Sequence, residues 1–389
     1  MGNQIARELP ASFEDMPDKK KEGFLKMRKL KESGKNVVGT FCTYTPKEVM
    51  YAAEIVPVGL CGVDNLHVAD AEVDLPANLC PLIKSSYGNA LTDSCPYFYF
   101  SDMILGETTC DGKKKMYEIL NKEIKETYIM MLPQSYDLES GVRYYMSEIE
   151  RFIKRLESRF NVEITEEKLR KAIHESNEDR KHFAKLLKMG ELIPAPFKGL
   201  DMINILQNYD FCFTRNEKNE MVDRAIETAE SVYERIRYDE EMRRRPRILL
   251  TGGPNAGLRQ KVVKVFDDNN ADIVVTDSCN GIKEKLDMID ETLPPIEALA
   301  KKYIQVPCSV MTQNDRRIES LGKLIDDYHI DGVFEVNLQA CHTFQIESRR
   351  IEKYVTEVKK LPYSKISTDY SNDDKGQINT RINAFLEML

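Results

Sequence analysis

Two stretches of this chain alternate short apolar segments with helical segments, and this alternation limits the folds open to it. In the first stretch, buried strands are predicted at Asn36–Cys42, Val56–Cys61 and Tyr128–Leu132. In the second stretch, strands are predicted at Arg247–Gly252, Asp272–Thr276, Tyr303–Val306, Asp331–Val336 and Ser364–Ser367. Because strands that alternate with helices form βαβ units, the sequence predicts an α/β fold with two Rossmann-like parallel-sheet domains. The two halves are candidates for a shared fold.

Helical patterns fill the rest of the chain. The N-terminal residues are charged and place Phe24, Met27 and Leu30 at helical spacing, which predicts a helical arm. A middle segment ending at the Arg243–Pro246 run shows the same periodicity among dense charge, and its arginines indicate a solvated helix end. The expected division is an arm at 1–35, a first α/β domain at 36–137, a helical domain at 138–245 and a second α/β domain at 246–389.

Two junctions between elements carry local signals. Thr45 and Glu48 flank Pro46 in the pattern of a capping box with proline at the first helical position. The Gly252–Gly257 segment resembles a phosphate loop only superficially, because it lacks both the Gly-Lys-Ser/Thr ending and a G-x-G-x-x-G register. A tight turn between a strand and a helix is the preferred interpretation.

Charge and hydropathy exclude several classes of protein. The 389 residues carry 56 Lys and Arg against 64 Asp and Glu, a net charge of −8 that disfavours a nucleic-acid-binding protein. The first residues lack the apolar core of a secretory signal. The longest apolar stretch, Ala52–Val63, is short and contains Glu54, so no membrane helix is predicted. A cytoplasmic location is expected by default.

Nine cysteines are the chain's most informative residues. An odd number without a secretion signal argues against a disulfide framework, and no two form a C-x-x-C pair of the kind found in zinc ribbons and ferredoxins. Cys279, for example, lies between a predicted strand and a helix expected at Ile282–Ile289. Six cysteines follow a predicted strand or open a predicted helix in this way: Cys42, Cys80, Cys110, Cys279, Cys308 and Cys341.

This placement predicts a common chemistry. The carboxyl ends of parallel strands meet at one edge of a sheet, where ligands bind. Helix N-termini at that edge stabilise thiolates, which are the form of cysteine that binds metal. Three such cysteines come from each half of the chain, so we expect them to hold a metal cluster together.

Other residues have simpler interpretations. Cys61, within an apolar strand, and Cys212, between two phenylalanines, are expected to be small buried hydrophobic residues, while Cys95 stays open between ligand and core. Lys84, Ser85 and Ser86 either hold an anion or form an ordinary capped helix with a surface lysine, and Lys113, Lys114 and Lys115 indicate a solvated face. His342 fits a hydrogen bond to a metal ligand or a solvated helix start equally well. No catalytic residue is predicted.

Three segments resemble a known superfamily. Asn78–Tyr87 (NLCPLIKSSY), Thr108–Lys113 (TTCDGK) and Gln339–Thr343 (QACHT) are similar to the cluster-binding segments of the 2-hydroxyacyl-CoA dehydratase and benzoyl-CoA reductase superfamily. The resemblance extends over nearly the whole chain. Within the superfamily, the double-cubane cluster proteins are the most similar group.

The resemblance implies a cofactor, partners and a reaction. It implies a homodimer with an 8Fe-9S double-cubane cluster held by six cysteines, of which Cys80, Cys110 and Cys341 match the family segments. Cys42, Cys279 and Cys308 would supply the additional thiols, with Cys95 or Cys61 as a replacement for one of them. A separate ATP-hydrolysing 4Fe-4S activator protein would deliver low-potential electrons, and a small substrate would be reduced between the two domains. Oxygen sensitivity is expected.

Two alternatives remain open. The first is a subunit of a 2-hydroxyacyl-CoA dehydratase, which would carry one 4Fe-4S cluster, pair with an unlike subunit and perform a radical dehydration. The second is a non-catalytic iron–sulfur carrier or scaffold. The identity of the substrate cannot be inferred from the sequence.

Overall fold

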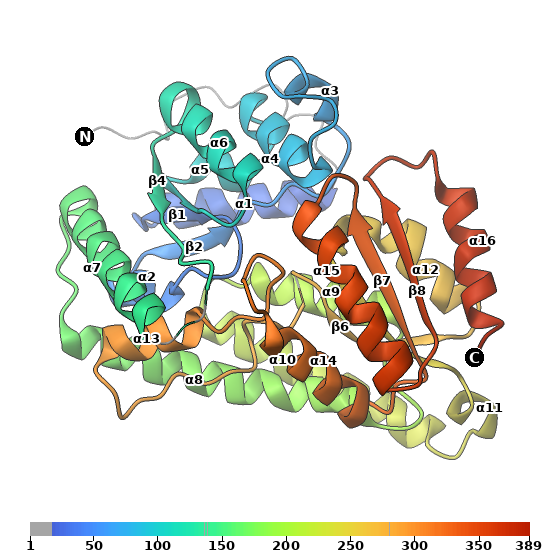
Figure 1. Cartoon of the computed structure of the whole chain (residues 1–389). Helices are drawn as coiled ribbons and strands as arrows, with labels where there is room; N and C mark the ends of the chain where they lie inside the picture. Colours follow the sequence, from blue (N-terminus) through green and yellow to red (C-terminus); the bar gives the residue numbers. More distant parts are fainter. Residues whose placement is uncertain (1–17, 136, 138, 280) are drawn as a thin grey trace. The chain divides into compact units, whose positions relative to one another are not determined.

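The computed structural model describes residues 18–135, 137, 139–279 and 281–389. In this part of the chain, eight strands form two four-stranded sheets with helices around them (Figure 1). The strands are β1 (Val37–Thr40), β2 (Val56–Gly59), β3 (Met103–Glu107), β4 (Thr127–Met130), β5 (Arg247–Gly252), β6 (Asp272–Asp277), β7 (Gly332–Leu338) and β8 (Tyr363–Thr368). The α-helices are α1 (Asp18–Glu32), α2 (Lys47–Ala52), α3 (Val68–Ala71), α4 (Pro81–Leu91), α5 (Pro96–Phe100), α6 (Asp111–Ile119), α7 (Ser140–Phe160), α8 (Glu166–Lys188), α9 (Gly199–Asp210), α10 (Arg215–Ile236), α11 (Glu240–Arg243), α12 (Lys264–Asp268), α13 (Pro295–Tyr303), α14 (Asp315–Asp327), α15 (His342–Lys353) and α16 (Lys375–Leu386).

The contacts within the chain divide it into two compact units, each with one sheet. Unit 1 takes the described residues of Met1–Pro133, Asp137–His174 and Asp290–Ile304. Unit 2 takes those of Gln134–Tyr136, Glu175–Ile289 and Gln305–Leu389. The division into four segments expected from the sequence stays a prediction.

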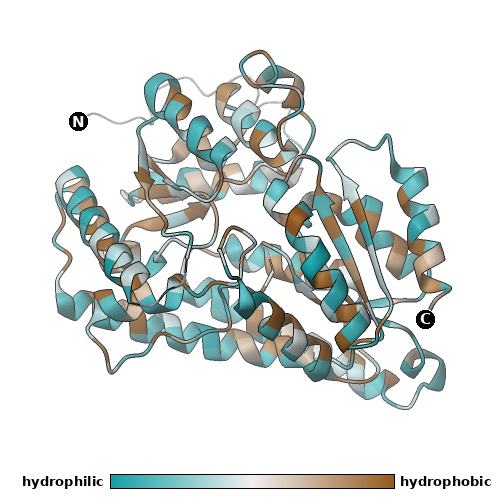
Figure 2. Ribbon diagram, in the orientation of Figure 1, coloured by the Kyte–Doolittle hydropathy of each residue, from teal (hydrophilic) through white to brown (hydrophobic). Residues whose placement is uncertain are grey.

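Both sheets are parallel and have the same strand order. The order is β2-β1-β3-β4 in unit 1 and β6-β5-β7-β8 in unit 2, and every strand pair is parallel. The inner strands are buried along their whole length, as expected for sheets covered by helices on both faces. Figure 2 shows these strands as predominantly apolar. The predicted α/β fold class is therefore confirmed, and the two halves share one sheet topology.

Two predicted elements of the second half are wrong. Tyr303–Val306 is no strand, because Tyr303 ends helix α13 and the next residues form a turn. A short apolar run fits a buried helix end as well as a strand, and here the buried face of α13 extends to Tyr303, whose hydroxyl donates to Glu48. The helix expected at Ile282–Ile289 is also absent, since residues 281–285 form turns after β6.

The junction before α2 differs from its prediction as well. Thr45 does not cap the helix; its hydroxyl donates to the buried carboxylate of Glu107 at the end of β3. Pro46 occupies the capping position, so α2 begins one residue later than the proline signal predicts. The tight turn at Gly252 is confirmed: its φ is +111°, and a Cβ there would lie 2.2 Å from the carbonyl oxygen of Val336.

The helical segments match the periodicity of the sequence. Helix α1 buries Phe24 and Met27, and the Phe24 ring lies 5.6 Å from that of Phe100, while residues 1–17 of the expected arm lie outside the described residues. Helix α7 buries an apolar stripe at helical spacing that includes Tyr145, Ile149 and Phe152. Among the described residues, no helix is both long and apolar enough to span a membrane.

Candidate metal centre

Four cysteines of unit 1 lie at or near the carboxyl edge of its sheet. Cys42 is the second residue after β1, and Cys61 is the second residue after β2. Cys80 and Cys110 occupy the capping positions of α4 and α6. The prediction that Cys61 is a buried residue inside a strand is wrong, because β2 ends at Gly59 and Cys61 is half-buried in the following loop.

The loop that carries Cys61 is fixed against helix α4. The backbone N–H of Gly62 donates to Ser86 Oγ at 2.9 Å, and the N–H of Asp64 donates to Ser85 Oγ at 3.3 Å. A Cβ on Gly62 would lie 2.6 Å from the backbone carbon of Ser85, so only glycine allows this approach. Ser85 and Ser86 therefore position the loop of Cys61.

Helices α4 and α6 contact each other through their first turns. A Cβ on Gly112 would lie 2.6 Å from Ile83 Cδ1 and 3.2 Å from Leu79 Cδ1. Cys80, which is buried, and Cys110, which is half-buried, precede these two turns. Neither cysteine side chain caps its helix through a hydrogen bond. The partial positive charge of each helix start therefore acts on a nearby sulfur.

Cys42 adopts a left-handed backbone conformation with φ of 65°, which is uncommon for a residue other than glycine. Glu107 holds the turn that follows, because its carboxylate accepts from the backbone N–H of Tyr44 at 3.0 Å and from Thr45 Oγ1. The Cys42 sulfur lies 3.3 Å from Thr109 Oγ1 and 2.8 Å from Lys113 Nζ. The strained turn thus directs this sulfur toward the start of α6.

Lys113 is the residue of unit 1 that the sequence interpretation misses. The sequence predicts it on a solvated face, but it is only 4% exposed, and its Nζ also lies 4.0 Å from the sulfur of Cys61. Helical spacing from Met116, Tyr117 and Leu120 is the available signal, since these apolar residues define the buried face of α6. Lys114 and Lys115 are exposed, as predicted.

Burial and charge act in opposite directions on this group of residues. Burial raises the pKa of Cys42 to about 12, even though the ammonium of Lys113 lowers it. For Lys113, burial alone would lower the pKa, but the sulfur atoms of Cys42 and Cys61 raise it well above its usual value. The result is a buried ammonium whose nearest polar partners are sulfur atoms. A neutral thiol is a weak acceptor, so a negatively charged sulfur would complete this arrangement.

Unit 2 has three of the predicted cysteines. Cys279 is the second residue after β6, Cys341 is the third residue after β7 and caps α15, and Cys308 lies in the turn after α13. A hydrogen bond from Cys279 lowers the pKa of Cys308 to about 5, despite the opposing effect of burial. The charges of Lys283 and Arg317 and the backbone N–H of Val310 contribute to the same lowering of the pKa, so the surroundings of Cys308 favour its thiolate form.

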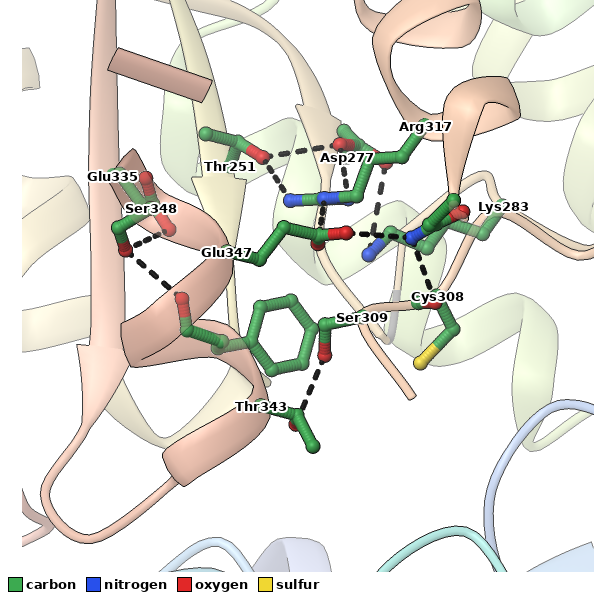
Figure 3. A network of polar contacts seen from close by, with 12 residues as sticks. Thr251, Asp277, Lys283, Cys308, Ser309, Arg317, Glu335, Thr343, Glu347 and Ser348 are labelled. Carbon is green, nitrogen blue, oxygen red and sulfur yellow. Dashed lines mark hydrogen bonds and ion pairs between the residues drawn. The ribbon is translucent and has the colours of Figure 1, made fainter. Parts of the chain in front are cut away.

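Buried ion pairs support the Cys308 turn (Figure 3). Arg317 donates to Asp277 Oδ2 at 2.8 Å and to Thr251 Oγ1 at 2.9 Å, and its Nε lies 2.9 Å from Glu347 Oε2. Lys283 Nζ lies 3.9 Å from Asp277 Oδ1. In this view the sulfur of Cys308 points away from the ion pairs. Two cations and two carboxylates therefore neutralise one another behind the sulfur.

Asn314 and Ser309 connect the Cys308 turn to its neighbours. Asn314 Nδ2 donates to the carbonyl of Cys308 at 2.8 Å and to Glu347 at 2.7 Å. Ser309 Oγ donates to Thr343 Oγ1 at 3.0 Å, in the first turn of the helix that Cys341 caps. His342 is exposed, which favours a solvated helix start over a hydrogen bond to a metal ligand.

The two units place cysteines at equivalent positions. Cys61 and Cys279 are each the second residue after the outer strand, β2 or β6. Cys110 and Cys341 are each the third residue after the second inner strand of their sheet, β3 or β7, and each caps the following helix. Cys42 has no counterpart, because Pro254 is the second residue after β5. The shared topology therefore shows that Cys61 occupies the same position as Cys279, which the apolar pattern of its segment does not indicate.

The donor set fits an iron–sulfur group, which takes cysteine thiolates as ligands. All nine cysteines are described, and none forms a disulfide. Across the described residues, no three His, Cys, Asp or Glu side chains come close enough to hold one metal ion. The buried cation at Cys42 and the lowered pKa of Cys308 suit such a group.

The remaining candidates lie elsewhere. Cys95 caps α5 and is half-buried. The prediction that Cys212 is buried is wrong, because it is half-buried in the segment between α9 and α10. The surface interpretation of Lys84 is wrong, since its side chain is 9% exposed and its Nζ lies 2.6 Å from Glu72 Oε1. That pair connects α4 to the end of α3, so Lys84 also has a structural role.

The parallel sheets and the cysteines at their edges define a two-sheet α/β protein with sulfur-rich loops. Residues 42–389 match the model of the family described as 2-hydroxyglutaryl-CoA dehydratase, D-component, and the chain belongs to this family. Its relatives are named as subunits of dehydratases and of a reductase, so the chain is an enzyme subunit of the 2-hydroxyacyl-CoA dehydratase type within the superfamily that the sequence resembles.

Individual relatives cover almost all of the chain. It is 40% identical over 385 residues to the Escherichia coli protein named "Putative dehydratase subunit YjiM", in a match that covers 99% of this chain and 100% of the relative. It is 24% identical to the (R)-phenyllactyl-CoA dehydratase beta subunit of Clostridium sporogenes, over 93% of this chain and 94% of the relative. It is 22% identical to a benzoyl-CoA reductase subunit of Thauera aromatica, over 82% of this chain and 80% of the relative.

Proposed function

We propose that this chain is an iron–sulfur reductase component that accepts low-potential electrons from a separate ATP-hydrolysing 4Fe-4S activator protein and reduces a small substrate. In this proposal the chain forms a homodimer, acts in the cytoplasm and binds an 8Fe-9S double-cubane cluster. The ligands would be Cys42, Cys80, Cys110, Cys279, Cys308 and Cys341. The observation that carries the proposal is the equivalent position of Cys110 and Cys341, each of which follows an inner strand and caps the next helix in two sheets of one topology.

The chain's own residues would perform the supporting chemistry. The cluster, when bound, supplies one-electron reduction at low potential. Cys80, Cys110 and Cys341 occupy the capping positions of α4, α6 and α15, where the partial positive charge of a helix start would complement an anionic cluster. The hydrogen bond from Cys279 lowers the pKa of Cys308, which favours the form of this residue that binds metal. The turns at Cys42 and Cys308 are fixed by Glu107 and Asn314, which limits movement of the ligands.

The ligand set has one open position in unit 1. Cys42 has the nearest cation, whereas Cys61 has the topological counterpart in unit 2. Single Cys42→Ser and Cys61→Ser variants separate the two, because loss of the true ligand lowers bound iron more. Equal iron in both variants and in the unchanged chain would exclude both residues as ligands.

The second candidate function is a 2-hydroxyacyl-CoA dehydratase subunit with one 4Fe-4S cluster and an unlike partner. The names of the relatives favour it, since one is a dehydratase beta subunit and another carries the word dehydratase without a substrate. A carrier or scaffold is a third candidate. It would transfer its cluster to an apo-acceptor without any reduction.

ATP-dependent reduction distinguishes these candidates. The anaerobically purified chain is mixed with an activator-type ATPase, ATP and a reductant, and cluster reduction is followed by electron paramagnetic resonance. The proposal predicts that the cluster is reduced without an unlike subunit, at a rate that falls to background with a non-hydrolysable ATP analogue. Activity only after an unlike subunit is added supports the dehydratase, and cluster transfer without reduction supports the carrier.

A further inference from the structure

Lys113 makes polar contacts of an unusual kind for a buried cation. Its Nζ lies 2.8 Å from the sulfur of Cys42 and 4.0 Å from that of Cys61, and it also lies 5.3 Å from the centre of the Phe41 ring. The residue is 4% exposed. In the described part of the chain, no carboxylate forms an ion pair with it.

Two other buried cations of this protein have carboxylate partners. Lys261 is only 3% exposed, but its Nζ lies 2.6 Å from Asp374 Oδ1. Arg317 is 1% exposed and pairs with Asp277 at 2.8 Å. The charges at these sites are neutralised within the protein, so neither site requires a further anion. Lys113 differs from both, because its ammonium lies against sulfur atoms and the Phe41 ring, with no carboxylate pairing to it among the described residues.

We propose that Lys113 is a positioning residue that acts as the dedicated counter-charge of the cluster's sulfur ligands in unit 1 and makes the cluster easier to reduce. The inference rests on the proposed function. Burying an ammonium beside neutral thiols is unfavourable, whereas an anionic sulfur ligand turns the same contact into a charge-assisted hydrogen bond. Because reduction adds negative charge to the cluster, a fixed cation favours the reduced state.

A purely structural role would have a different signature. The stem of Lys113 fills space on the buried face of α6, and its ammonium lies over Phe41. Removing the charge while keeping the stem would then change the stability of the chain but leave the reduction potential of the cluster unchanged. The potential is therefore the measurement that separates the two roles.

The test compares Lys113→Met with Lys113→Arg and with the control Lys114→Met. Lys114 is on the same helix but exposed, and it pairs with Asp111 at 2.7 Å. Each anaerobically purified variant is titrated with a reductant of known potential, with electron paramagnetic resonance as the readout and iron counted per chain. Circular dichroism checks that each variant is folded.

We expect Lys113→Met to lower the ratio of reduced to oxidised cluster about tenfold at a given potential, which is ~59 mV for one electron. We expect Lys113→Arg to restore most of the ratio and Lys114→Met to match the unchanged chain. If Lys113→Met loses iron and Lys113→Arg does not, the difference also supports a counter-charge role for Lys113. An unchanged ratio in Lys113→Met, or equal iron loss in both Lys113 variants, overturns it. An unchanged chain that binds no iron overturns the proposed function and the inference together.

Discussion

The substitution Arg317→Met tests the buried ion pairs that support the Cys308 turn. Arg317 is 1% exposed, donates to Asp277 at 2.8 Å and to Thr251 at 2.9 Å, and lies 2.9 Å from Glu347. Methionine keeps the apolar stem and removes the guanidinium. The two carboxylates would then remain buried with Lys283, 3.9 Å from Asp277, as the nearest cation.

The expected cost follows from leaving a buried charge without its partner. Removing one member of a buried ion pair typically destabilises a protein by about 3–5 kcal/mol. Burial already raises the pKa of Glu347, so this carboxyl can take up a proton when Arg317 is lost. We therefore expect the lower end of the range, about 3 kcal/mol at pH 7. The loss should shrink as the pH falls, because protonated carboxyls no longer need the cation.

The matched control is Arg316→Met, at the preceding position of α14. Arg316 has 35% of its side chain exposed and lies 3.1 Å from Asp287, and such surface pairs contribute about 0–1 kcal/mol. Urea-induced unfolding of both iron-free variants is measured by circular dichroism at pH 7 and pH 5. If Arg317→Met lost no more stability than Arg316→Met at pH 7, the assignment of a costly buried network would be refuted.

Three further predictions concern the ligands, the loops and the pH dependence. Cys110→Ala should lose iron and reductase activity while the chain stays folded, whereas Cys212→Ala should keep both; full iron in the first variant would remove Cys110 from the ligand set. Gly62→Ala should destabilise the protein by about 1–3 kcal/mol and lower the amount of bound iron, because the new Cβ would lie 2.6 Å from the α4 backbone. The control Gly59→Ala should be neutral, because no atom lies within 4 Å of its Cβ. Equal urea midpoints for the two variants would contradict this prediction. Burial raises the pKa of Asp272 to about 6, so the protonated acid stabilises the fold below pH 4 and this contribution is lost as the pH rises to 7. The free energy of unfolding of Asp272→Asn, relative to that of the unchanged chain, should therefore rise by about 2–3 kcal/mol between pH 4 and pH 7. If the two proteins had parallel curves of stability against pH, the pKa of this carboxyl would not be perturbed.

The fold class could be predicted because strand and helix periodicities are properties of short segments. Seven of the eight strands in the described residues coincide with segments predicted as strands. The exception is β3, which the sequence interpretation does not assign. The false strand at Tyr303–Val306 has the opposite cause, because a short apolar run does not distinguish a strand from the end of a buried helix.

The positions of the cysteines were partly predictable for the same reason. The local patterns correctly place Cys110 and Cys341 at the starts of helices and Cys279 after a strand. The prediction for Cys61 is wrong, because the end of β2 depends on the contact of Gly62 with α4 and not on local composition. Contacts between distant segments set such loop geometries.

Lys113 shows where sequence interpretation is weakest. Three consecutive lysines indicate a solvated face, and two of them are exposed. Lys113 lies on the buried face because of its helical spacing from the apolar residues of α6. There it contacts the sulfur of Cys42, which is 71 positions away in the sequence. Chemistry that depends on such a pair requires the fold.

The iron and acid-labile sulfide content of the anaerobically purified chain decides whether it is an iron–sulfur protein and of which kind. We predict a brown protein that contains about eight irons per chain and a similar amount of sulfide, and that loses both in air. About four irons per chain would favour the dehydratase subunit instead. A colourless chain without iron, stable and active in air, would contradict the assignment of a cluster to these cysteines.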